Sequence, residues 1–178
     1  MKIVLDTCVL VPVLVRGLLL KIAELGKFTP LWSEKIFSEW QCTASKLGKN
    51  NAMRVEIEIL LMKSRWKDSM VTRDIAVENR LLLPDLDDRH VLSTAIARKA
   101  DFILTYNLRD FPIRTLASHN IKPRSPDSFL LEIFEESPKD FSRLVDELIE
   151  KELESGIEIL SKKTFLKRSG LPRLAKSL

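Results

Sequence analysis

The fold is decided by residues 88–105, which begin Asp88-Arg89-His90-Val91-Leu92-Ser93-Thr94-Ala95-Ile96-Ala97 and end in the apolar run Phe102-Ile103-Leu104-Thr105. Asp88 places a negative charge at the amino end of a helix that we expect to continue to Lys99. A helix followed directly by an apolar strand is typical of a parallel sheet covered by helices. The next turn contains Asp110, so carboxylates lie on both sides of this helix–strand unit.

The amino-terminal residues show the same pattern. Lys2–Leu5 is a short apolar run that predicts a strand, and Asp6 follows it directly. Residues 14–25 have the apolar density of a buried helix, which Gly26 ends. Because open parallel sheets place their sites at the carboxyl ends of the strands, we expect Asp6 at such a site.

Periodicity and capping residues predict the remaining elements. They are a helix capped by Ser33 and running to about Leu47, a helix over 51–66, a short strand at 69–71, a helical turn at 75–80, an edge strand at 121–123, and helices that begin at Ser125 and Ser137. We therefore expect an α/β protein. A three-layer α/β/α domain with a mainly parallel sheet is expected over residues 1–128, and a helical carboxyl-terminal extension with a basic tail over residues 129–178.

The chain has 178 residues, a net charge of +4 and a pI near 9.1, which suits one domain with a preference for anionic partners. Residues 161–178 contain only basic charged side chains: Lys162, Lys163, Lys167, Arg168, Arg173 and Lys176. The preceding residues 132–158 are predominantly acidic. Three accounts of the basic tail are open: it holds phosphates, it is a solvated helix face, or it docks on its acidic neighbour.

The cysteines and the amino-terminal apolar region argue against several classes of protein. Cys8 and Cys42 match the spacing of neither a zinc site nor a redox pair, so we expect two reduced thiols. Asp6 and Arg16 interrupt the apolar amino-terminal region, which argues against a signal peptide or a membrane anchor. A cytoplasmic protein is expected.

Four acids fall where binding sites are expected. Asp6, Asp88 and Asp110 lie at element ends, and Glu39 flanks the apolar face of its helix. Four carboxylates brought together repel one another unless a cation neutralises them. Mg²⁺ or Mn²⁺ prefers oxygen ligands and keeps several waters, which suits hydrolysis of phosphodiester bonds.

Other catalytic machinery is missing from the sequence. There is no glycine-rich phosphate loop, which argues against Rossmann and P-loop proteins. A haloacid-type phosphatase would need an acid where this chain has Cys8. The two histidines, His90 and His119, have no evident nucleophile partner, and His90 is expected to pack or hydrogen-bond locally.

Four motifs resemble the PIN-domain ribonucleases, and more narrowly the VapC-like toxins. The motifs are Ile3-Val4-Leu5-Asp6-Thr7-Cys8-Val9-Leu10, Trp32-Ser33-Glu34-Lys35-Ile36-Phe37-Ser38-Glu39-Trp40, Asp85-Leu86-Asp87-Asp88-Arg89-His90-Val91-Leu92 and Thr105-Tyr106-Asn107-Leu108-Arg109-Asp110-Phe111-Pro112. Together they span residues 1 to about 130. The closing Gly170-Leu171-Pro172 also resembles the carboxyl extension of a longer subgroup of these proteins.

The resemblance implies a set of site residues. It assigns catalytic roles to Asp6, Glu39, Asp88 and Asp110, metal binding to Asp6, Asp88 and Asp110, and supporting hydrogen bonds to Thr7, Thr105 and Asn107. Cys8 stands where many relatives have Asn. Asp88 is preferred to Asp87 because its spacing to Ala95 fits the family, and Asp87 is then expected to cap the helix.

The function implied is a Mg²⁺- or Mn²⁺-dependent endoribonuclease, the toxin of a type II toxin–antitoxin system, with RNA as substrate and an antitoxin as partner. Arg89, Arg109, Arg114 and the basic tail are candidate phosphate contacts, or ordinary surface arginines. Apolar residues in 14–20 and 53–62 belong either to the core or to a homodimer or antitoxin interface. A PIN-fold scaffold without catalysis and a housekeeping RNA-maturation nuclease remain alternatives.

Overall fold

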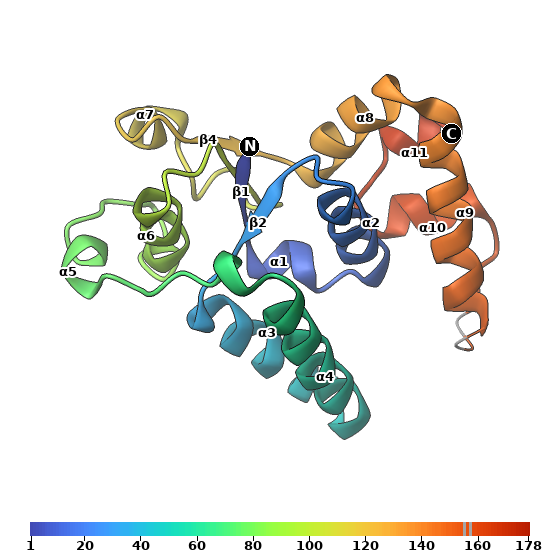
Figure 1. Cartoon of the computed structure of the whole chain (residues 1–178), viewed down its shortest axis with the longest axis horizontal. Coiled ribbons are helices and arrows are strands. Elements are labelled where there is room, and N and C mark those ends of the chain that lie inside the picture. The colour runs from blue at the N-terminus through green and yellow to red at the C-terminus, as the bar shows by residue number, and fades with distance from the viewer. Residues whose placement is uncertain (155, 157) are drawn as a thin grey trace.

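The computed structural model describes residues 1–154, 156 and 158–178. Its elements, in chain order, are β1 (Lys2–Leu5), α1 (Thr7–Leu10), α2 (Val13–Glu24), β2 (Thr29–Leu31), α3 (Glu34–Lys46), α4 (Lys49–Arg65), the short 3-10 helix η1 (Lys67–Ser69), α5 (Ile75–Glu78), α6 (Arg89–Ala97), β3 (Phe102–Leu104), α7 (Ile113–Ala117), β4 (Lys122–Arg124), α8 (Pro126–Glu136), α9 (Pro138–Glu154), α10 (Lys162–Arg168) and α11 (Leu174–Ser177). Figure 1 shows their arrangement.

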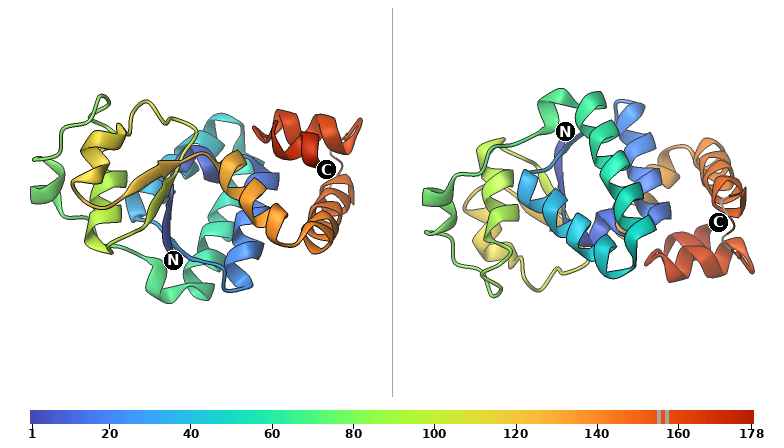
Figure 2. Two further views of the ribbon diagram at one scale, coloured as in Figure 1. Left: turned by 90° about the horizontal axis from the view of Figure 1, so that it is seen from above. Right: turned by 90° about the horizontal axis from the view of Figure 1, so that it is seen from below.

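The sheet is parallel throughout, in the order β2-β1-β3-β4. Figure 2 shows α6 on one side of it and α2, α3 and α4 on the other, which confirms the expected three-layer α/β/α architecture. Ile3, Val4 and Leu5 of the central strand β1 are fully buried. Strands covered on both faces need such continuous apolar runs, because neither side of the strand meets water.

Each edge strand has a proline at its centre, Pro30 in β2 and Pro123 in β4. The neighbouring residues make the ladder bonds, since Thr29 donates to the Met1 carbonyl and Lys122 donates to the Asp101 carbonyl. A proline has no backbone N–H to offer to another strand, so both edges of the sheet are protected against further pairing.

Most elements lie where the sequence predicts them. Ser33 caps α3 by accepting a hydrogen bond from the Ile36 N–H, and Gly26 takes φ +75° just past α2. The expected strand at 69–71 is instead η1 followed by one isolated bridge between Met70 and Trp32. The short elements β2, α1, α7, α10 and α11 were not predicted.

The carboxyl-terminal extension packs against the rest of the molecule beside α2 (Figures 1 and 2). The expected boundary at residue 128 falls in the first turn of α8. Phe129 of α8 meets Phe28 edge to face, with ring centroids 5.5 Å apart. Phe141 and Val145 of α9 are buried in the same apolar cluster as the strands.

Candidate active site

The carboxyl edge of the sheet brings together the ends of β1 and β3. Asp6 follows β1, and its backbone N–H donates to the Leu104 carbonyl at 3.1 Å. Thr105 follows β3 and is fully buried, while Asp6 is 5% exposed. Asp6 also occupies the N-cap position of α1, so its backbone is fixed by the sheet on one side and by a helix on the other.

Asp6 is held by two neighbouring side chains. The Thr105 hydroxyl donates to Asp6 Oδ2 at 2.7 Å, and the Cys8 thiol donates to the same oxygen at 3.0 Å. Asn107 contributes its backbone N–H, which donates to Thr105 Oγ1 at 2.9 Å. Thr105 therefore contacts Asp6 directly, and Asn107 contacts Thr105 through its backbone.

Cys8 has a polar role that its departure from the family pattern did not suggest. Its Sγ accepts a hydrogen bond from the Tyr106 N–H at 3.2 Å in addition to donating to Asp6. Burial, together with the nearby charge of Asp6, raises the pKa of the Cys8 thiol to about 12. The thiol therefore keeps its proton and remains able to donate.

Glu39 lies in a hydrogen-bond network that joins α1, α3 and α6. The Thr7 hydroxyl donates to Glu39 Oε2 at 2.9 Å, and His90 Nε2 lies 3.0 Å from Oε1. Burial alone would raise the pKa of Glu39, but the hydrogen bond and charge of His90, with help from Thr7 and Lys35, lower the pKa to about 2. Glu39 is thus a firmly ionised carboxylate and a weak base.

His90 is 3% exposed, and its partner was not foreseen. The sequence indicates a helix residue with local hydrogen bonds, whereas the structure pairs its ring with Glu39, which is remote in sequence. Its buried Nδ1 has no hydrogen-bond partner within the described part of the chain. Its place two residues after Asp88 is the signal that could have drawn attention to it.

Asp88 shares its surroundings with three other acids. Burial, followed by the negative charges of Asp6, Asp85 and Asp110, raises the pKa of Asp88 from 3.8 to about 7. The structure therefore brings Asp6, Asp88 and Asp110 within electrostatic reach of one another. Asp85 joins them, although the sequence suggests only a turn residue there.

Asp88 rather than Asp87 occupies the N-cap position of α6, so the expected capping role of Asp87 is wrong. The backbone N–H of Asp87 instead donates to Asp85 Oδ1 at 2.9 Å within the loop. The Asp88 side chain makes no capping bond, which leaves its oxygens available to another partner.

The acids suit a hydrated cation better than a closed protein cage. Among residues 1–154, 156 and 158–178, no group of three or more histidine, cysteine, aspartate or glutamate side chains is arranged so that it could hold a metal ion. Mg²⁺ keeps several waters and is usually held by one or two carboxylates, so a complete set of protein ligands is not required. The negative charges that contribute to the raised pKa of Asp88 would be offset by a positive charge beside it.

The candidate phosphate-binding arginines form no ion pair with the acids of the site in the described part of the chain. Arg89 is partly buried at the start of α6, while Arg109 and Arg114 are exposed. Within the described residues none of these side chains forms an ion pair, and the buried Arg89 Nε has no hydrogen-bond partner.

The apolar residues in 14–20 and 53–62 were expected either in the core or at an interface, and the two segments differ in how far they are buried. Leu14, Leu18 and Leu19 of α2 are buried in the core. On α4, one face is buried and the opposite face leaves four apolar side chains more than half exposed: Met53, Ile57, Leu60 and Leu61. In the described part of the chain, no helix is both long and apolar enough to cross a lipid bilayer.

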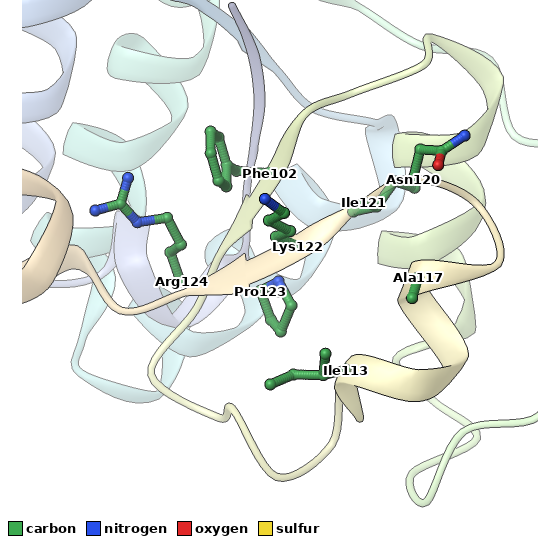
Figure 3. A pocket seen from close by; sticks show the side chains of 8 residues that line it. All are labelled: Phe102, Ile113, Ala117, Asn120, Ile121, Lys122, Pro123 and Arg124. Atoms are coloured by element: carbon green, nitrogen blue, oxygen red, sulfur yellow. The ribbon is translucent and has the colours of Figure 1, made fainter.

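A cavity of about 740 Å³ lies away from the acids, along the edge strand β4 (Figure 3). Residues of β4 and α7 line it, including Pro123 and Ile113, and Figure 3 shows these side chains around the strand. None of its lining residues is acidic. The cavity is therefore separate from the candidate active site.

Comparison with known proteins identifies a family and a relative of this chain. The family model described as "PIN domain" matches residues 2–109. Over 55 residues the chain is 44% identical to "Putative ribonuclease VapC50" of Mycobacterium tuberculosis (strain ATCC 25618 / H37Rv), a match that covers 29% of this chain and only 32% of that protein. No solved structure matches the chain at a significant level.

Proposed function

This chain belongs to the PIN-domain family, and from that premise we propose that it is a metal-dependent endoribonuclease, the toxin of a type II toxin–antitoxin pair. The observation that carries the proposal is the cluster of Asp6, Asp88 and Asp110 at the carboxyl edge of the sheet, where burial and the neighbouring negative charges together raise the pKa of Asp88 to about 7. The name of the M. tuberculosis relative, which describes a ribonuclease, supports the same activity.

In this proposal Asp6, Asp88 and Asp110 hold Mg²⁺ or Mn²⁺. Such an ion would supply an activated water and would stabilise negative charge that develops on the phosphate. Thr105 fixes the rotamer of Asp6 by its 2.7 Å hydrogen bond. Because the carboxylate is already oriented, binding of a metal ion costs little further side-chain conformational entropy.

Glu39 has a different task from the other acids. Thr7 and His90 hold its two oxygens, so the side chain is positioned before substrate arrives. A carboxylate accepts several hydrogen bonds, and the remaining lone pairs can orient a water molecule at the cluster. Its low pKa argues for orientation of that water and against general base catalysis.

Replacement of Asp6 or Asp88 by Asn tests the proposed site. Each change keeps the shape of the side chain and removes a negative charge, so RNA cleavage in Mg²⁺ or Mn²⁺ is expected to fall by about 100-fold or more, as for loss of several kcal/mol of transition-state stabilisation. Chelation by EDTA should abolish cleavage by the wild-type protein, and added Mn²⁺ should restore it.

Asp87→Asn is the matched control, because Asp87 is exposed and adjacent in sequence. It is expected to cleave RNA within about twofold of the wild type. Wild-type rates in the Asp6 and Asp88 variants, or cleavage that persists in EDTA, would refute the assigned centre.

Expression in a bacterial host distinguishes the toxin from its rivals. A toxin should stop growth only when Asp88 is intact, and sequencing of RNA ends should show new internal cuts that a coexpressed antitoxin suppresses. A maturation nuclease would instead produce the ends of mature RNAs, and a scaffold without catalysis would produce no new ends.

A further inference from the structure

The basic carboxyl-terminal segment, residues 161–178, is a folded part of the protein. Leu166 of α10 and Leu171 and Leu174 around α11 are fully buried. The backbone N–H groups of Arg173 and Leu174 donate to the two carboxylate oxygens of Asp127 at 2.9 and 3.1 Å. Asp127 is 5% exposed, so these bonds attach the start of α11 firmly to α8.

A chain of hydrogen bonds connects this segment to the acidic cluster. The Tyr106 hydroxyl donates to the Ser169 carbonyl at 2.8 Å. The Tyr106 backbone N–H donates to Cys8 Sγ, and Cys8 donates to Asp6. Ser169 is thus separated from the candidate metal ligand Asp6 by only two intervening residues.

Gly170 permits this close approach. It has φ +81°, and a Cβ atom at this position would lie 2.7 Å from the Tyr106 ring. Such a distance is shorter than any ordinary contact, so the backbone of residue 170 rests directly on the ring. The position of α10 beside the site is therefore determined by the fold.

The docked segment carries positive charge that the protein does not neutralise. Lys162 pairs with Asp146 at 2.8 Å. The other basic residues are exposed and form no ion pair with any described residue: Lys163, Lys167, Arg168, Arg173 and Lys176. The expectation that the tail docks on its acidic neighbour thus accounts for one contact and leaves most of the charge free.

Arg168 also lines a hollow of about 300 Å³ between α10 and the start of α2. Pro12, Val13 and Phe165 form part of its wall, next to the short helix α1 that Asp6 caps. An aromatic ring beside a guanidinium is the combination with which single-stranded nucleic acids are bound. Glu158 also lines the hollow, so phosphates are expected on the Arg168 side of it.

We propose that Lys167 and Arg168, docked beside the acidic cluster through Tyr106, bind the backbone phosphates of single-stranded RNA and position the strand for cleavage. The inference rests on the proposed ribonuclease function and names the surface that holds its substrate. The cluster itself repels phosphate, so affinity must come from positive charge nearby.

The test compares the double variant Lys167→Gln/Arg168→Gln with the control Lys99→Gln/Lys122→Gln, each in the full chain. Lys99 and Lys122 are exposed and lie at the amino edge of the sheet, opposite the site. Binding of a fluorescein-labelled 20-nucleotide single-stranded RNA is measured in EDTA at several salt concentrations. The plot of the logarithm of the binding constant against the logarithm of the salt concentration has a slope set by the number of phosphate contacts. Loss of two contacts should reduce the size of this slope by about 1.4 and weaken binding ~20-fold at 0.1 M salt.

Cleavage kinetics in Mn²⁺ provide the second measurement. A positioning surface should raise KM about tenfold or more and leave kcat within about twofold, because these side chains bind RNA without touching the reacting atoms. The control variant should retain the KM and the salt slope of the wild type. Both variants should keep the wild-type melting temperature, since the altered side chains are exposed and unpaired.

If the Lys167→Gln/Arg168→Gln variant bound RNA as tightly as the wild-type protein does, the inference would be overturned. The proposed function would still stand, provided that the wild-type protein cleaves RNA. Equal losses in both variants would also overturn it, because they would indicate an unlocalised effect of net charge. A variant that binds RNA normally but loses a polypeptide partner would refute it too. A wild-type protein that cleaves no RNA in Mn²⁺ refutes the proposed function instead.

Discussion

Asp88 and Glu39 are two carboxylates of the candidate site whose pKa values shift in opposite directions. The pKa of Asp88 is raised to about 7 by burial and by the neighbouring acids, whereas Glu39, hydrogen-bonded by His90 and Thr7, has its pKa lowered to about 2. Glu39 has its positive partners within the protein. Asp88 forms no ion pair with any described residue, and the charge of His90 offsets only part of the effect of burial and of the acids, so a bound cation or a proton has to provide the compensation.

Replacement of Asp88 by Asn should therefore stabilise the protein at pH 8 in the absence of divalent ions. Because the pKa of Asp88 is higher in the folded than in the unfolded state, the free energy of unfolding falls as the pH rises from 3.8 towards about 7. Above pH 7 it stays lower by the full amount. Each pKa unit is worth about 1.4 kcal/mol, and because Asp88 is only partly buried we expect about 1–2 kcal/mol in total. The melting temperature should rise by about 5 °C.

The difference between Asp88→Asn and wild type should shrink when the melting curves are recorded at pH 4, where the carboxyl is protonated in the folded protein. Added Mg²⁺ should stabilise the wild type and leave the variant unchanged. Asp87→Asn should melt like the wild type under every condition. An Asp88→Asn variant that is less stable than the wild type at pH 8 would contradict the electrostatic account.

At this scale the sequence predicts the acids better than their partners. Asp6 and Asp88 could be placed because strand ends and helix starts are visible in the hydrophobic pattern. The pairing of His90 with Glu39 could not, since it depends on how α6 and α3 meet across a parallel sheet. The same holds for Asp85, whose charge acts on Asp88 through loop geometry.

Among the elements, α11 depends most clearly on a single side chain. It has only four residues, too few to be stable alone, and its first N–H groups are satisfied by Asp127 of α8. A helix start that finds a buried carboxylate gains both hydrogen bonds and a favourable charge at its positive end.

Asp127→Ala should consequently release the carboxyl-terminal segment. Two N–H groups would lose a charged acceptor, which costs about 1.5–3 kcal/mol for each bond. Hydrogen exchange should accelerate in residues 162–178 while α3 and α4 remain protected. Asp140→Ala provides the control, because Asp140 is also an acid in the first turn of a helix but is largely exposed, 3.7 Å from Arg143. Equal exchange in both variants would contradict the anchoring role.

Element prediction succeeded where the pattern was long and failed where it was short. The helices α2, α3 and α4 follow the expected ranges closely, and α8 and α9 begin where they were expected, because each shows several turns of apolar periodicity or a clear capping residue. The strand β2 has three residues with Pro30 at its centre, which argues against a strand unless the position is an edge. The helix α1 is a single turn whose start coincides with the site residue Asp6.

At the scale of the whole molecule, the extension over 129–178 packs closely against α2 and shares the apolar cluster of the sheet. Phe141 of α9 is 4% exposed and lines a cavity of about 350 Å³ with Ile22 of α2. A Cβ atom on Gly17 of α2 would lie 3.3 Å from Leu148 of α9, which shows how closely the two helices approach. The apolar cluster that includes the strands continues through α8 and α9.

Phe141→Ala should therefore destabilise the entire protein. Removal of a buried phenylalanine costs about 3–5 kcal/mol, and the adjoining cavity limits collapse, so we expect the melting temperature to fall by about 10 °C. The three tryptophans, Trp32, Trp40 and Trp66, all lie before residue 128 and report on the sheet and its helices. Their fluorescence and the far-ultraviolet circular dichroism should shift together, because a cooperative unit unfolds in one transition.

Leu160→Ala, at a side chain 81% exposed in the extension, should leave both curves in place. If Phe141→Ala shifted only the helical signal and not the tryptophan transition, the extension would fold as a separate unit, and the basic segment 161–178 would be attached to the sheet domain without being stabilised by it.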